Sequence, residues 1–400
     1  MAPNEETQQF IRQHTDDDVR QLALRRTVPA GVDLPTALRQ IEGRQTARRK
    51  LPSWAAIDGI VYPPHLNLEQ CSSESTARYK ADLCRRLTGG GGRLVDLTGG
   101  LGVDTAFMAE VFECAVYVER DEHLCELART NLPLACTVPV EVVCADGTDY
   151  LQRADRSALI FIDPSRRDNH GGRTYALADC SPNVVPLVGE LLRRADHVML
   201  KLSPMLDWRK AVADVGRQHV SQVHIVAAGG ECKELLLVLQ PQADAFTLVC
   251  ADTVTGMTYH VADNNEAGFP LPCQAPARGM FLYEPHAAVM KAGCFAALSR
   301  DFGVSPLAPN SHLFLSAEVL QSPSFPGRRF LIEAVTTLNK HTLKATLGHL
   351  RQANISVRNF PLSAQALRHR LKLADGGPHY IFATTLADNS HVLLLCQKEY

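Results

Sequence analysis

A glycine-rich turn between two apolar segments constrains this chain more than any other part of its sequence. An apolar run ends in Asp96, and Gly99, Gly100 and Gly102 follow it closely. Glycine lets the backbone turn tightly from a strand into a helix and lets a ligand approach the main chain. The next apolar run also ends in an acid, Glu119. This arrangement predicts a binding site for a cofactor that carries a ribose.

The composition is that of an ordinary globular protein. Of 400 residues, 46% are hydrophobic and 21% are charged, which suits two or three domains. The formal net charge of −2 means that a nucleic-acid partner would need a local basic face. The N-terminus is polar, no run approaches the roughly 18 apolar residues of a membrane span, and the twelve cysteines form no C-x-x-C pair. We therefore expect a cytoplasmic protein with reduced thiols, no metal and no membrane partner.

From residue 93 onward the sequence alternates strand-like and helical segments. The first five predicted strands are separated by lengths that suit crossover helices, which predicts a parallel sheet. The last two are joined only by Ala228-Gly-Gly-Glu-Cys-Lys233 and should form an antiparallel hairpin. The expected fold class is therefore α/β, with a Rossmann-like, doubly wound sheet of seven strands. The predicted strands span residues 93–97, 114–119, 139–145, 158–163, 197–203, 222–227 and 234–240.

Other kinds of segment flank that sheet. Residues 1–64 lack strand-like alternation and are predicted to form a helical N-terminal region. The run Glu284-Pro-His-Ala-Ala-Val-Met-Lys291 is expected to begin a helix with proline in its first turn. From about residue 310 the pattern indicates a small α/β domain. The predicted boundaries are 1–64 for the helical region, 65–245 for the sheet domain, 246–322 for a linker and small segment, and 323–400 for the C-terminal domain.

Two classes of ribose-bearing cofactor fit an acid at the end of the second strand: nicotinamide dinucleotides and S-adenosylmethionine. The dinucleotide fingerprint needs a third glycine, three residues after the second, so that helix and strand pack closely. That position holds Thr105. The carboxylate of Asp96 would repel a pyrophosphate, whereas it suits the amino group of a methionyl moiety. These residues favour S-adenosylmethionine.

The combination resembles the class I S-adenosylmethionine-dependent methyltransferases over roughly residues 65–240. The resemblance implies that the glycine loop, with Asp96 and Thr98, holds the methionyl end of the cofactor. It also implies that Glu119 binds both ribose hydroxyls and that Asp146 contacts the adenine amino group. Each acid alone could simply cap the next helix, but the matches fall in order at the ends of successive predicted strands.

The segment before the first strand offers further candidates. Glu69-Gln-Cys-Ser-Ser-Glu-Ser-Thr76 places hydroxyls ahead of a helical stretch. In methyltransferases of this kind the helix before the first strand often packs over the methionine carboxylate, which implies Ser73 and Thr76 as cofactor contacts. Plain capping of that helix accounts for the same residues equally well.

The acceptor side departs from the usual pattern. Asp163-Pro164 matches the Asp/Asn-Pro motif that lies beside the reacting methyl group in this class, but Ser165 and Arg166 follow in place of a second proline and an aromatic. Asp163 can still accept a proton from a substrate nitrogen. RNA uracil-5-methyltransferases share Asp-Pro-x-Arg, yet they need a nucleophilic cysteine after the fifth strand, where this chain has Lys201-Leu-Ser-Pro-Met205. The sequence therefore favours nitrogen over carbon as the acceptor.

Three cations are expected around the mouth of the sheet. Arg166, Arg167 and Lys201 would grip a phosphate there, because arginine in particular matches phosphate geometry. Ion pairing with Asp168 or Asp207 is the alternative interpretation.

The C-terminal segment from residue 325 is basic. It holds ten Lys/Arg and four Asp/Glu, so its formal balance is 10 − 4 = +6, which favours a nucleic-acid face over a merely solvated surface. Ile355-Ser-Val-Arg-Asn-Phe-Pro361 and Gly376-Gly-Pro-His-Tyr-Ile-Phe382 resemble the THUMP-like domain of a family of bacterial methyltransferases, and Phe281-Leu-Tyr-Glu-Pro-His286 resembles the ferredoxin-like segment before it. THUMP domains deliver structured RNA to a catalytic domain. The resemblance thus implies methylation of RNA, with a protein or small-molecule substrate, or a catalytically idle RNA-binding protein, as the alternatives.

Overall fold

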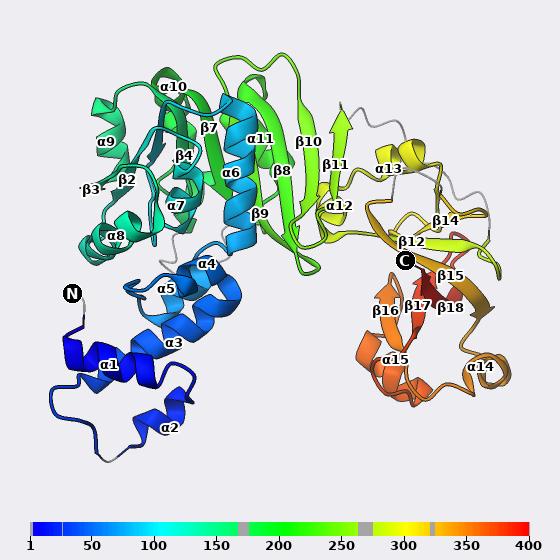
Figure 1. The fold of residues 1–400 in the computed structure, drawn as a ribbon. Coiled ribbons are helices and arrows are strands. Elements are labelled where there is room, and N and C mark those ends of the chain that lie inside the picture. Colours follow the sequence, from blue (N-terminus) through cyan, green and yellow to red (C-terminus); the bar gives the residue numbers. More distant parts are fainter. Residues whose placement is uncertain (1–2, 26, 167–175, 263–274, 321–324, 400) are drawn as a thin grey trace. The chain divides into compact units, whose positions relative to one another are not determined.

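The computed structural model describes residues 3–25, 27–166, 176–262, 275–320 and 325–399. The chain divides into two compact units (Figure 1). Unit 1 comprises residues 1–228 and 233–246, and unit 2 comprises residues 229–232 and 247–400. No helix among the described residues is long and apolar enough to cross a membrane.

Within the described part of the chain, unit 1 begins with five helices, and the first three are each started by a polar side chain that accepts from free backbone N–H groups. Asn4, Asp18 and Asp33 are such N-caps. Phe10 and Ile41 are buried in a small apolar cluster among these helices. The helices are α1 (Glu5–Gln13), α2 (Val19–Ala23), α3 (Leu34–Lys50), α4 (Pro52–Ala56) and α5 (His65–Gln70).

The central element of unit 1 is a largely parallel sheet to which this unit contributes seven strands in the order β8-β9-β7-β4-β1-β2-β3. The pairs β1–β2, β1–β4, β2–β3 and β4–β7 are parallel, and β9 runs antiparallel to β7. This confirms the predicted Rossmann-like α/β fold, although the whole sheet has nine strands among the described residues and not the seven expected. The strands are β1 (Arg93–Asp96), β2 (Cys114–Glu119), β3 (Val140–Cys144), β4 (Ser157–Ile162), β7 (Ala195–Leu202), β8 (Val220–Ala228) and β9 (Glu231–Leu239).

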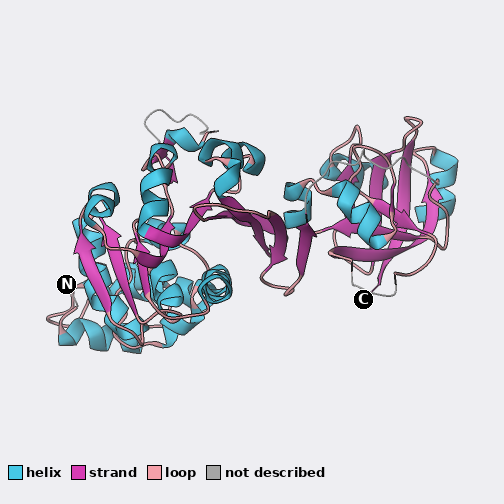
Figure 2. Cartoon of the chain, turned by 90° about the horizontal axis from the view of Figure 1, so that it is seen from above, coloured by secondary structure: helices cyan, strands magenta, loops and turns pink. Residues whose placement is uncertain are grey.

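Helices flank the strands of this sheet, as Figure 2 shows in its cyan and magenta colouring. The helix before β1, α6 (Glu74–Thr88), starts at the N-cap Ser73 and ends at Gly89, which adopts a left-handed conformation with φ of 72°. Residues of α6 and α7 share an apolar core with one face of the sheet. The later helices are α7 (Val103–Ala109), α8 (Glu122–Ala135), α9 (Gly147–Arg153), α10 (Val188–Arg194) and α11 (Trp208–Val215). A short pair, β5 (Ser165–Arg166) and β6 (Cys180–Ser181), follows β4 along the chain.

Unit 2 contains the antiparallel pair β10 (Thr247–Asp252) and β11 (Thr258–Ala262) and a seven-stranded sheet in the order β13-β14-β12-β15-β18-β17-β16. The helices α14 (Lys340–Leu347) and α15 (Ala364–Leu371) bury Leu347 and Leu367 in an apolar cluster with strands of that sheet. The remaining elements are β12 (Phe281–Pro285), α12 (Ala287–Ala292), α13 (Phe295–Phe302), β13 (Ser305–Pro306), β14 (Phe314–Ser316), β15 (Gly327–Thr336), β16 (Asn354–Arg358), β17 (His379–Thr385) and β18 (His391–Glu399).

One prediction for this unit was wrong. Glu284 and Pro285 end strand β12, and the helix begins only at Ala287. The reason is that Phe281–Pro285 pairs with β15, so cross-strand pairing overrides the preference of proline for a first helical turn. The same pairing places β12 and β15 in one sheet, on either side of the boundary predicted at 322/323.

Candidate active site

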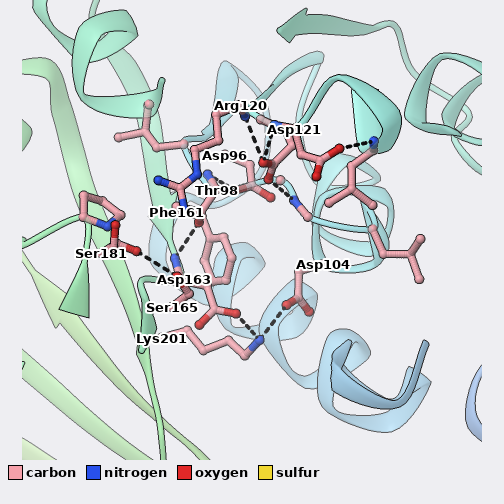
Figure 3. Close-up of a pocket in the computed structure, with 18 of the residues that line it drawn as sticks. Asp96, Thr98, Asp104, Arg120, Asp121, Phe161, Asp163, Ser165, Ser181 and Lys201 are labelled. Atoms are coloured by element: carbon pink, nitrogen blue, oxygen red, sulfur yellow. Dashed lines mark hydrogen bonds and ion pairs between the residues drawn. The ribbon is translucent and has the colours of Figure 1, made fainter. Parts of the chain in front are cut away.

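A cavity of about 800 Å³ opens at the carboxyl ends of β1, β2 and β4 (Figure 3). Strand β1 has β2 on one side and β4 on the other, which is the switch point where open α/β sheets bind ligands. The volume lies within the range of ordinary small-molecule sites. The cavity brings together most of the site residues expected from the sequence, namely Asp96, Thr98, Gly99, Gly100, Glu119, Asp146, Asp163, Ser165 and Lys201.

The glycines of the turn serve different steric purposes. Gly100 and Gly102 have φ angles of 53° and 81°, in the left-handed region that side chains disfavour. Gly99 has an ordinary φ, but a Cβ there would lie 2.2 Å from the ring of Tyr117. The Tyr117 hydroxyl donates to the carbonyl oxygen of Gly100 at 2.5 Å. The turn therefore needs glycine at 99 because the tyrosine ring of β2 fills the space beneath it.

Glu119 is held by three backbone N–H groups. Its Oε2 accepts from the N–H of Gly100 at 2.9 Å, and its Oε1 accepts from those of Arg120 and Asp121 at 2.9 Å each. These contacts orient the carboxylate over the turn. Oε1 already accepts two hydrogen bonds, but Oε2 keeps a lone pair for a further one, so the group is suited to accept from a hydroxyl in the cavity.

Asp96 is buried, with 1% of its surface exposed. Its two oxygens accept from the Thr105 hydroxyl at 2.6 Å and from the N–H of Thr98 at 2.9 Å. Burial raises the pKa of Asp96 to about 7, although the hydrogen bonds from Thr105 and Thr98 oppose the rise. Thr105, which stands where a dinucleotide site would need glycine, is therefore the hydroxyl that fixes this carboxyl group.

Asp146 is the N-cap of α9. Its Oδ1 accepts from the N–H of Thr148 at 2.8 Å and from the hydroxyl of the same residue, and this side-chain hydrogen bond is the largest cause of its lowered pKa. The neighbouring Gly147 passes so close to β1 that a Cβ there would lie 2.2 Å from the carbonyl oxygen of Leu97. Asp146 thus caps a helix and lines the cavity at the same time.

Ser73 and Thr76 lie at the start of α6. Neither lines the cavity, and Ser73 accepts from the N–H of Thr76 as the N-cap of that helix. Ser72, one residue earlier, does line the cavity, and its hydroxyl donates to Asp104 at 2.8 Å. Gly102 and Pro164 are also absent from the lining.

On the acceptor side, Asp163 and Lys201 face each other across the ends of β4 and β7 (Figure 3). The Nζ of Lys201 lies 2.5 Å from Oδ2 of Asp163 and 3.2 Å from Oδ2 of Asp104. Of the alternative partners suggested by the sequence, Asp207 is not among these contacts, and Asp168 lies outside the described residues. Ser165 donates to the carbonyl oxygen of Ser181 at 3.2 Å. Arg167 and the side chain of Arg166 lie outside the described residues.

Sequence reasoning missed three charged residues, Lys80, Asp104 and Glu234, of which Asp104 lines the cavity. Lys80 of α6 is completely buried, and its Nζ lies 2.7 and 2.8 Å from the two carboxylate oxygens of Glu234 and 3.2 Å from Oδ1 of Asp104. The signal was present, since Lys80 interrupts the apolar stripe of Ala77, Ala81 and Cys84 at helical spacing.

Burial and charge oppose each other in this cluster. Burial by itself would raise the pKa of Asp104, but the ammonium groups of Lys80 and Lys201 outweigh it and hold that pKa below its usual range. Burial raises the pKa of Glu234, although the same two lysines counteract the rise. For Lys201, burial favours the neutral amine, yet the carboxylates of Asp163 and Asp104 prevail and raise its pKa. Lys201 is therefore an ammonium group at neutral pH.

Comparisons with known proteins identify the family of the chain. The chain matches a ferredoxin-like domain family over residues 281–326 and a THUMP domain-like family over residues 327–398. It is 32% identical to a protein from Porphyromonas gingivalis W83 that is assigned as a methyltransferase and whose crystal structure superposes with a TM-score of 0.87, covering 100% of both chains. It is also 28% identical over 327 residues to an uncharacterised S-adenosylmethionine-dependent methyltransferase of Mycobacterium tuberculosis, covering 81% of this chain and 84% of that protein.

Fold and site thus define a class I methyltransferase that uses S-adenosylmethionine. Within that class, the chain belongs to the family of methyltransferases that carry a ferredoxin-like segment and a THUMP-like domain after the catalytic sheet. No group of three or more metal-binding side chains suited to an ion is found in the described parts of the chain.

The close contact at Gly99 gives a stability prediction. Gly99→Ala should lower the free energy of unfolding by about 1–3 kcal/mol, because the new methyl group overlaps the Tyr117 ring. Gly189→Ala, in helix α10 with open space around its Cβ position, is the matched control and should be neutral or stabilising. Thermal and denaturant unfolding measure both, and equal stability of the two variants would contradict the steric argument.

Proposed function

We propose that this methyltransferase acts on structured RNA, at a base nitrogen. The observation that carries the proposal is the convergence of Asp96, Glu119 and Asp163 on one cavity, in a chain whose C-terminal segment is strongly basic. When bound, S-adenosylmethionine supplies an electrophilic methyl group on a sulfonium. The protein's own residues then hold the cofactor and bring the acceptor into line with that methyl group.

The contacts of each acid support a division of roles for the cofactor. Glu119, fixed by three N–H groups, accepts from the ribose hydroxyls. Asp96 and the turn at Thr98 and Gly100 hold the methionyl end. Asp146 offers its Oδ2, which the helix cap does not use, to the adenine amino group. A buried aspartate in the turn suits an ammonium group and would oppose a pyrophosphate.

For the acceptor, Asp163 is the proposed proton or hydrogen-bond acceptor. Its backbone N–H donates to the Thr98 hydroxyl at 2.7 Å, which couples its position to the cofactor turn. Lys201 pairs with its carboxylate, and Ser165 lies at the cavity edge. Pro164 follows Asp163 directly and fixes the backbone there.

RNA is supported by the charge of the C-terminal segment. Among its exposed cations, Lys340 and Lys344 lie one turn apart on α14, while Arg370 and Lys372 lie at the end of α15. Such positions can neutralise backbone phosphates. The THUMP-like match at residues 327–398 covers both helices.

Removing the Glu119 carboxylate should abolish tight cofactor binding. Glu119→Ala loses the charge-assisted hydrogen bonding between this carboxylate and the ribose, so affinity for S-adenosylmethionine should fall at least about a hundredfold by calorimetry. Glu122→Ala, an exposed acid in the first turn of α8, is the control and should bind as the wild type does. Unchanged binding in Glu119→Ala would refute the assigned role.

Cofactor binding should also depend on pH through Asp96. Its pKa of about 7 means that the folded protein carries a partly protonated carboxyl near neutrality. A ligand ammonium binds only the ionised form well, so affinity should rise with pH and fall by about an order of magnitude between pH 7.5 and pH 6. Calorimetry in buffers of different ionisation enthalpy should detect proton release on binding. Asp96→Asn should bind more weakly with no such pH dependence, and a pH-dependent Asn variant would exclude Asp96 as the source.

RNA binding should depend on the exposed lysines of α14. Lys340→Glu/Lys344→Glu should weaken binding to RNA and lower the slope of log affinity against log salt by about 1.5 to 2. Arg12→Glu/Arg20→Glu carries the same charge change on exposed residues of α1 and α2 and should bind as the wild type does. Filter binding or fluorescence anisotropy across salt concentrations provides the measurement. If the Lys340→Glu/Lys344→Glu variant binds RNA as the wild type does, or if neither protein binds RNA, a protein or small-molecule substrate is favoured.

A further inference from the structure

Two lysines and three acids form a continuous charged cluster beneath the acceptor end of the cavity. Lys201 links Asp163 to Asp104, and Asp104 in turn lies 3.2 Å from Lys80, which binds Glu234 through both carboxylate oxygens. The side chains of Lys80 and Glu234 are 0% and 4% exposed, so this pair is removed from water.

The alternation of side chains along the strands explains why these charges meet. Leu159 and Phe161 of β4 face the core shared with α6 and α7, so Asp163, two residues on, faces the same side. In β7, Met199 faces this core, so Lys201, two residues on, faces the same side. In β9, Leu236 faces this core, so Glu234, two residues earlier, faces that side too. Helices α6 and α7 supply Lys80 and Asp104 from above that face. Each charged residue of a strand thus faces the same side as residues two positions away, which carry apolar side chains.

Burying this cluster is unfavourable for stability alone. Apolar side chains of similar volume often stabilise a core as well as or better than a buried ion pair does. The cluster also extends to three residues that line the cavity, Asp104, Asp163 and Lys201, and the last of these is an ammonium group. The electrostatic question is therefore which acceptor benefits from a fixed positive charge beside it.

The answer depends on how the acceptor's charge changes during methyl transfer. An adenine ring nitrogen or an exocyclic amine attacks as a neutral lone pair and becomes positive, which the Lys201 ammonium would oppose. A ribose hydroxyl, or the N–H of the lactam edge of guanine or uracil, must lose its proton and develops negative charge. A positioned cation stabilises that charge, and an adjacent carboxylate takes the proton.

We infer that the methyl acceptor is a weakly acidic group of the RNA, either a ribose hydroxyl or a lactam N–H, that Asp163 takes its proton and that Lys201 stabilises the resulting anion. The inference rests on the proposed function, because RNA is the source of the acceptor. Among base nitrogens, the inference restricts the acceptor to those of a lactam N–H. It also admits the ribose hydroxyl, which likewise must lose a proton before it accepts the methyl group.

The step balances without any further reactant. The O–H or N–H bond of the acceptor breaks, and its proton passes to the Asp163 carboxylate. The electron pair left on the acceptor forms the new bond to the methyl carbon as the carbon–sulfur bond breaks. That second electron pair stays on sulfur, which becomes a neutral thioether. Lys201 keeps its proton throughout, and Asp163 later releases its own to water.

Lys80 and Glu234 act as positioning residues in this scheme. They hold Asp104, and Asp104 holds the Lys201 ammonium in place. Three carboxylates face two ammonium groups, so the cluster carries one surplus negative charge when all five groups are ionised. Taking up the acceptor's proton removes that surplus and builds no net positive charge in the low-dielectric interior.

Product analysis is the decisive experiment. The full-length protein is incubated with S-adenosylmethionine and total RNA from a strain lacking the gene, and digested nucleosides are analysed by mass spectrometry. A 2′-O-methylnucleoside, 1-methylguanosine or 3-methyluridine supports the inference, and these products distinguish the two kinds of acceptor. N6-methyladenosine, 1-methyladenosine or another methylated amine overturns the inference but leaves the RNA proposal intact. Absence of any methylated nucleoside overturns the RNA proposal itself.

Substitution at Asp163 separates proton transfer from simple hydrogen bonding. Asp163→Asn keeps an acceptor oxygen but cannot take a proton, so kcat should fall about 10²–10⁴-fold with S-adenosylmethionine affinity little changed. An acceptor that reacts as a neutral amine would tolerate this change. Full activity in Asp163→Asn therefore contradicts the inference.

Substitution at Lys201 tests the cation. Lys201→Met should lose kcat to a similar extent while Lys201→Arg, which keeps the charge, should retain more activity than Lys201→Met. If Lys201→Met unfolds, the comparison of Lys201→Arg with Asp163→Asn and the product analysis still decide the question. Equal kcat in the Met and Arg variants, with both folded and both binding cofactor, would overturn the role of the charge.

Discussion

The turn after β1 is the constraint on which the rest of the site depends. Asp96 accepts from the N–H of Thr98, and the Thr98 hydroxyl accepts from the N–H of Asp163 at the end of β4. Two residues further along, Gly100 donates to Glu119 at the end of β2 and accepts from Tyr117. One short turn therefore fixes the ends of three strands relative to one another. The cofactor side and the acceptor side of the cavity are both set by it.

The second organising feature is the alternation of side chains between the two faces of each strand. Asp96, Glu119, Asp163, Lys201 and Glu234 each stand two residues from an apolar side chain in the same core. Period-two alternation thus directs all five toward the helices α6 and α7. Because the polar ends and the apolar middles of the strands share one face, the core that holds the sheet together also orients the charges. Chemistry and packing cannot be separated on this face.

Much of this architecture could be predicted from the sequence. The apolar runs located the seven strands that unit 1 contributes to the catalytic sheet, because each is bounded by turn residues or helical stretches that interrupt the pattern. The errors came where tertiary pairing decides: Glu284-Pro285 carries a local helix-start signal, yet β15 recruits it into a strand. Lys80 and Glu234 were missed because they pair with each other across 154 residues of sequence, and no local pattern indicates so distant a contact. Only the interruption of an apolar stripe by a lysine indicated that a buried charge needed a partner.

The formal charge of the C-terminal segment also cannot be judged from its own residues alone, because some of its cations pair with distant carboxylates. The formal balance of +6 includes Arg328 and Arg358, but both bind Glu284, which precedes the counted segment and is almost fully buried. Arg368 is likewise paired, with Asp375. Cations that already neutralise a carboxylate contribute less to phosphate binding, because that contact must be weakened before a new one forms. The basic character available to RNA is therefore concentrated on α14 and the end of α15, and not spread evenly over the module.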